Sequence, residues 1–510
     1  MILSERSLQL FSEKINAPHN NYFQLPEKVL QFGTGVLLRA LPDHFIDEAN
    51  KQNIFNGRIV VVKSTTQGNT DAFAAQNGLY TICVKGIEQE KIIDETYINA
   101  SISRVLFAAT EWEKILEFAV SDELEIIISN TTEVGITLLD DDNIFANPPS
   151  SFPGKLLSTL YKRFIFFEGD TQKGLIIIPT ELIPDNAAKL KNILITLSKQ
   201  NKLSDEFIDW LDKHNDFCSS LVDRIVPGKL NAADKISLEN GLGYEDELMI
   251  MAEPYRLWAI ETGNENVKEK LSFSQCDEGV IIAPDITKFR ELKLRLLNGT
   301  HTLNCGLAVL AGFETVKDAM QNAYFKNFVK QLMLGEIAAS VISDQITIED
   351  AMQFGDKVID RFSNPFIEHL WLNITLQYSS KMLTRNVPIL KKHYQQTDNV
   401  PEYIALGFAG YILFMKSKKN DENKFIGNNG ISDYVINDDK AGILYAKWNE
   451  KNIHETVSDI LGDENLWNTD LNSFPGFRDA VTKNVESLIS GGVKNTIGNL
   501  LTKTTVTNNE

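Results

Sequence analysis

Cysteine and histidine are scarce in this sequence, which limits the chemistry that it can support. It contains 4 cysteines and 7 histidines among 510 residues. The cysteines are far apart and form no CxxC pair, so we expect reduced thiols and neither a disulfide framework nor a structural zinc site. The histidines show no ligand spacing, and we expect no metal.

A long apolar run and an excess of positive charge are also missing. No apolar stretch approaches the roughly 18 residues that a membrane-spanning helix needs, and the opening residues lack the basic-then-apolar layout of a signal peptide. The formal net charge of −19 argues against a nucleic-acid partner, because phosphates are bound through an excess of lysine and arginine. A small anionic ligand needs only a local cationic pocket. We expect a cytoplasmic protein with neither a membrane nor a nucleic-acid partner.

The remaining composition, 43% hydrophobic and 23% charged, is that of an ordinary globular protein. At this length two or three domains are expected. No coiled coil is legible, so the oligomeric state stays open between a monomer and a weak oligomer.

The first half of the chain alternates apolar strands with helices. Strands are expected at 57–64, 124–136, 174–182 and 278–286, and helices at 203–217 and 245–262, among others. Continuous apolar strands separated by helices are typical of a buried parallel sheet in βαβ units. We therefore predict a doubly wound, Rossmann-like α/β domain over residues 1–286.

From residue 287 onward the pattern is helical. Helix-period segments follow one another at 289–312, 315–342, 347–362, 369–383 and 402–417, and the polar stretch 418–439 is expected to be a long surface loop. The predicted second domain, residues 287–510, is mostly α-helical. Substrate sites often lie in a cleft between domains, and we expect one here.

A glycine pair lies between the first strand and the helix that follows it, in "QFGTGVLLRA". Gly33 allows a tight turn, and Gly35 lets a pyrophosphate approach the backbone. This context favours nucleotide binding over a plain turn. Lys63 stands at the end of the second strand, where an acidic residue would mark NAD preference. Lys63 either contacts a 2′-phosphate or is solvated, so these residues leave NAD and NADP open.

The helical half contains a polar cluster in "KLRLLNGTHT". On an α-helix Lys293, Asn298 and His301 fall within an arc of about 140°. A desolvated lysine beside a cationic cofactor acts as a general acid/base. The asparagine amide is suited to hold a developing alkoxide, and the histidine to orient the hydroxyl. The pattern predicts hydride-transfer chemistry on a carbinol.

Four motifs in order resemble the mannitol dehydrogenase family of polyol-specific long-chain dehydrogenases. They are the K-x4-N-x2-H pattern, the GxGxxxR loop, the VDRI segment within 221–228 and the RFxNP segment within 361–370. The resemblance implies an oxidoreductase that uses NAD, with Lys293 as the general acid/base and with Asn298 and His301 on the reacting oxygen. It also implies a set of cofactor-binding residues, namely Phe32, Gly33, Thr34, Gly35, Arg39 and Asn130.

Within the family, the segments 129–136, 176–183, 217–228 and 297–302 are similar to the tagaturonate reductase subgroup. That resemblance implies interconversion of D-tagaturonate and D-altronate with NAD(H). Alternatives are a member that acts on fructuronate or on a neutral polyol such as mannitol, and a catalytically silent nucleotide-binding sensor.

Two departures bear on the substrate. Mannitol-specific members have SCDN where this chain has Leu182 as the last residue, so Asn186 is the candidate for a second oxyanion amide. An arginine of the polyol members appears here as Asn373.

A sugar-acid substrate also needs a cation for its carboxylate. Lys381 and Arg385 lie four apart on one helix face, and either can pair with a carboxylate; the alternative is an exposed basic face. Asp223 and His369 complete the candidate substrate-binding residues, although Asp223 with Arg224 can instead form a structural ion pair.

Overall fold

A computed structural model describes residues 1–8, 10, 11, 15, 18, 20–64, 70–131, 134–448 and 452–507. Contacts between residues divide the chain into two compact units. The first unit comprises 1–85 and 92–286, and the second comprises 86–91 and 287–510. Two residues of the predicted segment 129–136, Thr132 and Glu133, lie outside the described residues.

A six-stranded sheet forms the centre of the first unit among the described residues. Its order is β5-β2-β1-β6-β7-β8, and every pair is parallel. The strand order therefore reverses between β1 and β6, which is where doubly wound folds bind their ligands. The strands are β1 (Glu27–Phe32), β2 (Arg58–Lys63), β5 (Ile102–Phe107), β6 (Ile126–Ser129), β7 (Ile176–Pro179) and β8 (Asp216–Phe217).

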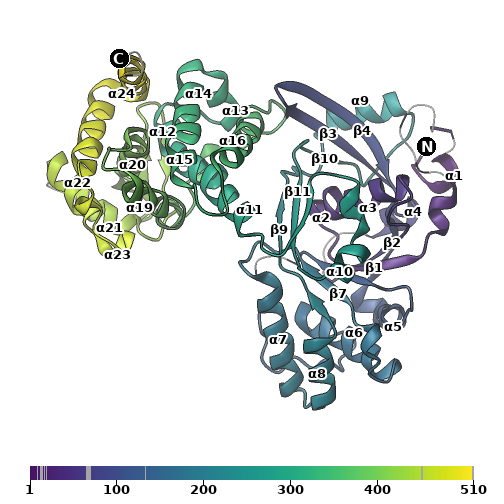
Figure 1. Ribbon diagram of the computed structural model, residues 1–510. Coiled ribbons are helices and arrows are strands. Elements are labelled where there is room, and N and C mark those ends of the chain that lie inside the picture. Colours follow the sequence, from purple (N-terminus) through teal and green to yellow (C-terminus); the bar gives the residue numbers. More distant parts are fainter. Residues whose placement is uncertain are drawn as a thin grey trace. The chain divides into compact units, whose positions relative to one another are not determined.

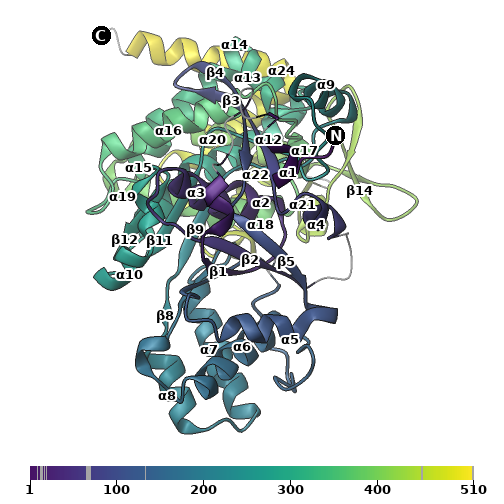
Figure 2. The same ribbon diagram turned by 90° about the vertical axis from the view of Figure 1, so that its right-hand side faces the viewer.

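Helices cover both faces of this sheet. Because successive side chains of a strand point to opposite faces, Val29 joins one apolar core, whereas Leu30 and Phe32 join the other. The second core is closed by four helices, which Figures 1 and 2 show together on one side of the sheet. These helices are α5 (Ala108–Ala119), α6 (Phe152–Phe166), α7 (Asn186–Gln200) and α8 (Asp205–Lys213). The first core packs under α2 (Val36–Ala40) and α3 (Pro42–Lys51).

Two smaller sheets complete the first unit, and they overturn one prediction. The predicted helix over 245–262 is wrong, because this stretch forms β10 (Ile250–Ala252) and β11 (Leu257–Glu261). Pro254 lies between them and lacks the N–H that a helix interior requires. The sheets have the orders β10-β3-β4 and β12-β11-β9. Their other strands are β3 (Tyr80–Glu88), β4 (Lys91–Asn99), β9 (Ser220–Asp223) and β12 (Val280–Ala283).

The second unit is mostly helical, as predicted. The helix α20 (Glu402–Phe414) is buried along almost its whole length and packs against both α12 (Thr300–Leu310) and α24 (Phe477–Thr507) (Figure 1). The other helices include α11 (Thr287–Leu292), α13 (Val316–Gln321), α14 (Ala323–Lys330), α16 (Ile348–Phe362), α17 (Trp371–Ile374), α18 (Tyr378–Lys381), α19 (Val387–Gln396), α21 (Ala441–Trp448) and α22 (Ile453–Leu461). The doubly wound α/β half followed by a helical half is therefore confirmed.

The stretch 418–439 was expected to be a loop and is partly a sheet. It contains the antiparallel strands β13 (Lys418–Lys419), β14 (Phe425–Asn428) and β15 (Asp433–Val435). Asn423 and Gly430 have positive φ, which suits the tight turns between such short strands. Across the described ranges, no helix has the length and apolar character needed to cross a membrane.

Candidate functional site

The polar cluster of the second unit lies on a helix that is locally unwound. Residues Thr287–Leu292 and Thr300–Leu310 are α-helical, but Lys293–Gly299 between them form a π-helix. In a π-helix the hydrogen bonds run from residue i to i+5, so Lys293 and Asn298 lie about one turn apart. A regular α-helix would set them about 140° apart. The π-helix thus brings the lysine and the asparagine closer to one line along the helix, and both side chains are half-buried.

His301 begins the α-helical part and is buried by aromatic rings. Its ring centroid lies 3.9 Å from that of Phe362, 5.2 Å from that of His369 and 5.8 Å from that of Trp371. Its Nδ1 is buried and has no hydrogen-bond partner among the residues that the structure describes. Burial is the main cause that lowers the pKa of His301 well below 6.5, and the electrostatic interactions with His369 and Arg361 lower it further. The imidazole is therefore neutral at physiological pH.

The positive charges of Arg385 and Lys381 also lower the pKa of His301. Both side chains are half-buried, so the alternative of an exposed basic face is not met. Lys381 Nζ donates to the carbonyl of Ile374 at 2.9 Å, and Arg385 Nη1 donates to Thr302 Oγ1 at 3.1 Å. Burial first, and then Arg385, lowers the pKa of Lys381. Two half-buried cations that lie close together favour an anionic partner.

The two glycines of the loop after β1 differ in what they meet. Gly33 has φ +130°, and a Cβ there would lie 2.9 Å from both the Asn130 carbonyl oxygen and the Leu38 Cδ1. Its N–H donates to Val62 at 3.0 Å. Gly33 is therefore required by the fold itself, where β1 and β6 diverge. Gly35 has φ −61° and no atom within 4 Å of its added Cβ, so nothing within the chain demands a glycine there.

Several predicted cofactor residues have side chains that the fold already uses. The Phe32 ring is fully buried against Phe152, with centroids 5.2 Å apart. Arg39 is 8% exposed, its Nη1 donates to the carbonyl of Leu248 at 2.7 Å, and its guanidinium lies 5.3 Å from the centroid of Tyr80. Only the backbone of these two residues remains for a ligand.

Asn130 and Thr34 keep more of their surface. Both are half-buried, and the Asn130 amide donates to the carbonyl and the hydroxyl of Thr180 at 3.0 Å each. Lys63 is buried, with its Nζ 4.8 Å from the ring centroid of Phe107. The alternative that Lys63 is a solvated surface residue is therefore wrong.

The Asn186 side chain is fully buried and makes five hydrogen bonds. Its two amide N–H groups donate to the carbonyls of Pro179, Glu181 and Ser220 at 3.0 Å each, with one N–H shared between two of these acceptors. Its oxygen accepts from the N–H groups of Ser220 and Ala187 at 3.1 and 2.9 Å. This arrangement ties the end of β7 to β9, and it favours a structural role over the predicted substrate contact.

Sequence reasoning missed Glu181, which also lies just after β7. Its buried carboxylate accepts from Ser129 Oγ at 3.1 Å and from Thr131 N and Oγ1 at 2.9 and 3.0 Å. Burial raises its pKa. Glu181 belongs to no motif with a recognisable spacing, so the sequence alone did not indicate that it is buried and hydrogen-bonded at this position.

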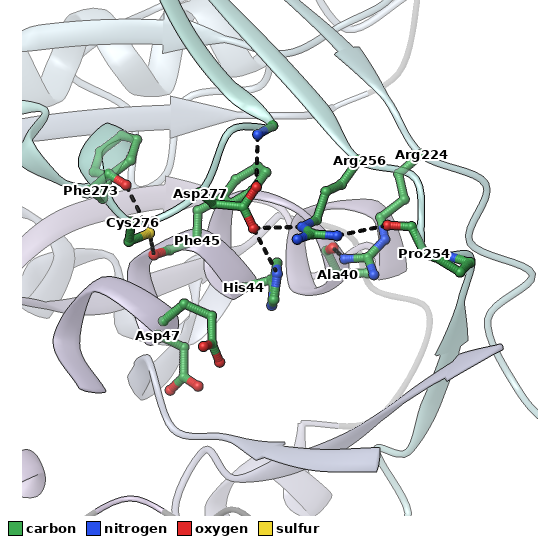
Figure 3. A network of polar contacts seen from close by, with 12 residues as sticks. Ala40, His44, Phe45, Asp47, Arg224, Pro254, Arg256, Phe273, Cys276 and Asp277 are labelled. Carbon is green, nitrogen blue, oxygen red and sulfur yellow. Dashed lines mark hydrogen bonds and ion pairs between the residues drawn. The ribbon is translucent and has the colours of Figure 1, made fainter. Parts of the chain in front are cut away.

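The VDRI segment enters a buried polar network in the first unit (Figure 3). Arg224 Nε donates to the carbonyl of Glu253 at 2.9 Å, and its Nη1 donates to that of Ala40. Nearby, the Asp277 carboxylate lies 2.6 Å from Arg256 Nε and 3.9 Å from His44 Nε2. These contacts anchor Arg224 to backbone carbonyls. Asp223 ends β9 and is 6% exposed.

Other candidate features add no reactive group. Within the described part of the chain, no group of three or more His, Cys, Asp or Glu is arranged to hold a metal ion. A cavity of about 530 Å³ in the first unit lies beside α7 and includes none of the predicted site residues. It is lined by Ile136, Thr137, Leu138, Pro184, Asp185, Ala188, Lys189, Asn192, Ile193 and Thr196.

Comparison with known families matches both halves of the chain. The mannitol dehydrogenase Rossmann domain matches residues 27–272, and the mannitol dehydrogenase C-terminal domain matches residues 285–489. Among solved structures, mannitol 2-dehydrogenase of Pseudomonas fluorescens, in a ternary complex with NAD and D-mannitol, is similar with a TM-score of 0.69 and 22% identity, over 99% of this chain and 100% of that one. Substrate-free D-sorbitol dehydrogenase has a TM-score of 0.78 and 19% identity, over 98% and 100%. These two likenesses show a shared fold.

Curated relatives are more similar in sequence. The altronate oxidoreductase of Bacillus subtilis is 35% identical over 468 residues, which are 91% of this chain and 93% of that protein. That of Halalkalibacterium halodurans is 34% identical over 487 residues, 94% of each. The family resemblance carried by the four motifs is confirmed. The chain belongs to the mannitol dehydrogenase family, and it is an oxidoreductase that acts on a CH–OH group.

Proposed function

We propose that the chain interconverts D-tagaturonate and D-altronate by NAD(H)-dependent hydride transfer. The observation that carries this proposal is the cluster of two half-buried cations, Lys381 and Arg385, near the buried His301. Arg385 donates to Thr302, the residue after His301, and both cations lower the pKa of His301. A neutral polyol gives such a cluster nothing to neutralise, whereas the carboxylate of a sugar acid does. The relatives are named altronate oxidoreductase, which supports one of these two sugar acids.

The reacting oxygen is handled by the K-x4-N-x2-H residues. Lys293 gives a proton to the carbonyl oxygen during reduction and takes it back from the hydroxyl during oxidation. The Asn298 amide donates a hydrogen bond to the oxygen as negative charge develops there. His301, neutral because it is buried, offers its unpartnered Nδ1 to a substrate hydroxyl.

The carboxylate binds to Lys381 and Arg385. The fork of the arginine matches a carboxylate with two parallel hydrogen bonds, and the lysine adds a point charge. Burial first, and then Arg385, lowers the pKa of Lys381, and a bound carboxylate offsets the repulsion between the two cations. His369 and Asp223 are proposed to contact the substrate hydroxyls. We leave Asn186 out of the substrate contacts, because its five hydrogen bonds lie within the fold.

A nicotinamide cofactor supplies the hydride acceptor and donor of this reaction. The residues that fit it lie at the reversal point of the strand order, where Gly35 is exposed and has space around its Cα. Gly35, Thr34, Asn130 and the backbone of Gly33 would hold its phosphates and ribose. We propose NAD over NADP, because Lys63 is buried against Phe107 and is thereby kept from a 2′-phosphate.

The test is the initial rate of NADH oxidation with D-tagaturonate, D-fructuronate and the neutral ketose D-tagatose, each repeated with NADPH. We expect D-tagaturonate with NADH to give the highest kcat/KM. Lys381→Met should raise the KM for D-tagaturonate about tenfold, since a charged hydrogen bond is lost, and should leave D-tagatose turnover unchanged. Equal turnover of the acid and the ketose would instead favour a polyol dehydrogenase, and NADH binding without any turnover would favour a sensor.

A further inference from the structure

Arg295 lies on the helix that carries Lys293, Asn298 and His301, and it contacts the helix that carries Lys381 and Arg385. Arg295 lies inside the π-helix Lys293–Gly299 and is 8% exposed. Its Nη1 donates to the carbonyls of Thr384 and Arg385 at 2.8 and 2.9 Å. Its Nε is held from behind by the Glu291 carboxylate at 3.0 Å. A buried guanidinium thus joins the backbone of the second helix to the first.

The second helix leaves this contact open for a local reason. In an α-helix the carbonyl of Thr384 would accept from the N–H of residue 388, but residue 388 is a proline and has none. The segment Met382–Asn386 is accordingly π-helical, as helices often are where the i+4 pattern is interrupted. Arg295 supplies the donor that Pro388 lacks, so the carbonyl of Thr384 has a hydrogen-bond partner.

The second helix returns a contact through Arg385. Its Nη1 donates to Thr302 Oγ1 at 3.1 Å. The Thr302 hydroxyl in turn donates its one proton to the Asn298 carbonyl at 2.7 Å, so its lone pairs are left for the arginine. Thr302 is fully buried, which fixes this geometry. We refer to Arg295, Thr302 and Arg385 together as the arginine clasp.

We propose that Arg295 and Thr302 are positioning residues that hold the Arg385 guanidinium in place for the substrate carboxylate. This inference rests on the proposed function, in which Arg385 binds that carboxylate. A free arginine side chain loses rotamer entropy when it binds a ligand. The clasp restricts the Arg385 side chain before the substrate binds, so less rotamer entropy is lost on binding. It also connects the proposed carboxylate-binding residue to the helix that carries Lys293, Asn298 and His301.

The experiment uses Thr302→Val, which removes the hydroxyl and keeps the shape of the side chain, beside Thr302→Ser, which keeps the hydroxyl. Steady-state kinetics are measured with D-tagaturonate and with D-tagatose, which lacks the carboxylate. We expect Thr302→Val to raise the KM for the acid about fivefold to tenfold, as a lost hydrogen bond to a charged group predicts, with kcat within about twofold. The ketose kinetics and the serine variant should match the unaltered enzyme.

A double-mutant cycle with Arg385→Gln separates positioning from general damage. If Thr302 acts through Arg385, Thr302→Val adds nothing to the raised KM of Arg385→Gln. Independent effects that multiply would overturn the inference, and so would an equal rise in the KM for both substrates.

Arg385→Gln also separates the failure of the inference from that of the proposed function. A normal KM for the acid in Arg385→Gln would overturn the carboxylate role of Arg385 and the clasp with it. A raised KM in Arg385→Gln but not in Thr302→Val would overturn only the clasp.

Arg295→Lys is a second probe, because lysine keeps the charge beside Glu291 but cannot present two forked N–H groups. We expect a rise in KM for the acid alone, about half as large on a logarithmic scale as that of Thr302→Val. If Arg295→Lys lowers kcat for the acid and the ketose equally, the residue only supports the fold and the proposal is wrong for it.

Discussion

Asn186 of the first unit and His301 of the second unit differ in how their buried polar atoms are satisfied. Asn186 is fully buried and makes five hydrogen bonds. In the second unit the buried Nδ1 of His301 has no partner among the described residues, and Lys381 and Arg385 lie close enough to repel each other.

This difference distinguishes polar groups that build the fold from those that serve a substrate. A buried polar group that is fully paired stabilises its surroundings, whereas one that is unpaired destabilises the empty protein and is usually kept for a purpose. We propose that the second unit supplies the chemistry and that the first unit supplies a backbone surface, with Gly35 as its open position. The first three predictions below each contrast a residue with a proposed role and one without.

The largest effect should come from Lys293→Ala, compared with Lys288→Ala on the same helix. Lys288 forms an ion pair with Asp350 at 2.6 Å and has no proposed role. Loss of a general acid/base lowers kcat about a thousandfold, while Lys288→Ala should change it less than about twofold, since half-exposed ion pairs contribute little. Initial rates with D-tagaturonate and NADH check this. Similar losses in both variants would show that the helix as a whole, and not the lysine, is needed.

Next in size is the contrast between the two asparagines. Asn186→Ala leaves several buried backbone groups without partners and should lower the free energy of unfolding by about 3 kcal/mol. Asn298→Ala should leave the melting temperature unchanged and lower kcat about a hundredfold, because an oxyanion donor is lost. The melting temperature and kcat of both variants, measured by thermal unfolding and steady-state kinetics, test these two expectations. An active, equally stable Asn186→Ala enzyme would break the comparison between the units.

The glycines test the same distinction inside the loop. Gly33→Ala forces a Cβ to 2.9 Å from the Asn130 carbonyl at φ +130° and should destabilise the protein by about 2 kcal/mol. Gly35→Ala has open space and an ordinary φ, so its melting temperature should not move. Its Kd for NADH, measured by fluorescence titration, should rise about tenfold because the cofactor loses its close approach. Unchanged NADH affinity would remove Gly35 from the cofactor site.

The smallest effect concerns pH and the first unit alone. Burial raises the pKa of Asp43 from 3.8 to about 8, so the folded chain keeps a proton there that the unfolded chain releases. The stability linked to this group is fully present below pH 3.8 and falls as pH rises through about 8. We expect the melting temperature to drop by a few degrees between pH 6 and pH 9, and less in Asp43→Asn. A variant with the same pH dependence as the unaltered chain would contradict this assignment.

The sequence predicted the main fold well where its pattern was local and repeated. Apolar strands such as 57–64 and 174–182 contain the observed β2 and β7, because long β-branched runs have few alternatives in a buried sheet. The stretch 245–262 misled, since its apolar residues fit a helix as well as two strands. Pairing of β10 with β3 and of β11 with β9 and β12 decided between them.

The candidate site divides in the same way. The spacing of Lys293, Asn298 and His301 was legible, because a functional pattern within nine residues survives any packing around it. The hydrogen bonds of Asn186 and the burial of Arg39 could not be predicted from the sequence. Their partners, such as Ser220 and Leu248, lie far away along the chain.

By itself, the sequence determined an acidic chain with an α/β half and a helical half, a glycine loop after the first strand, and a lysine, an asparagine and a histidine on one helix. These depend on residue type and on short spacings, which the chain carries wherever it folds. Only the tertiary structure decided that Lys293–Gly299 form a π-helix and that Arg295 donates to the carbonyls of Thr384 and Arg385. A buried arginine finds its acceptor only when a second helix lies against it, and the spacing of residues along one helix does not show which helix that is.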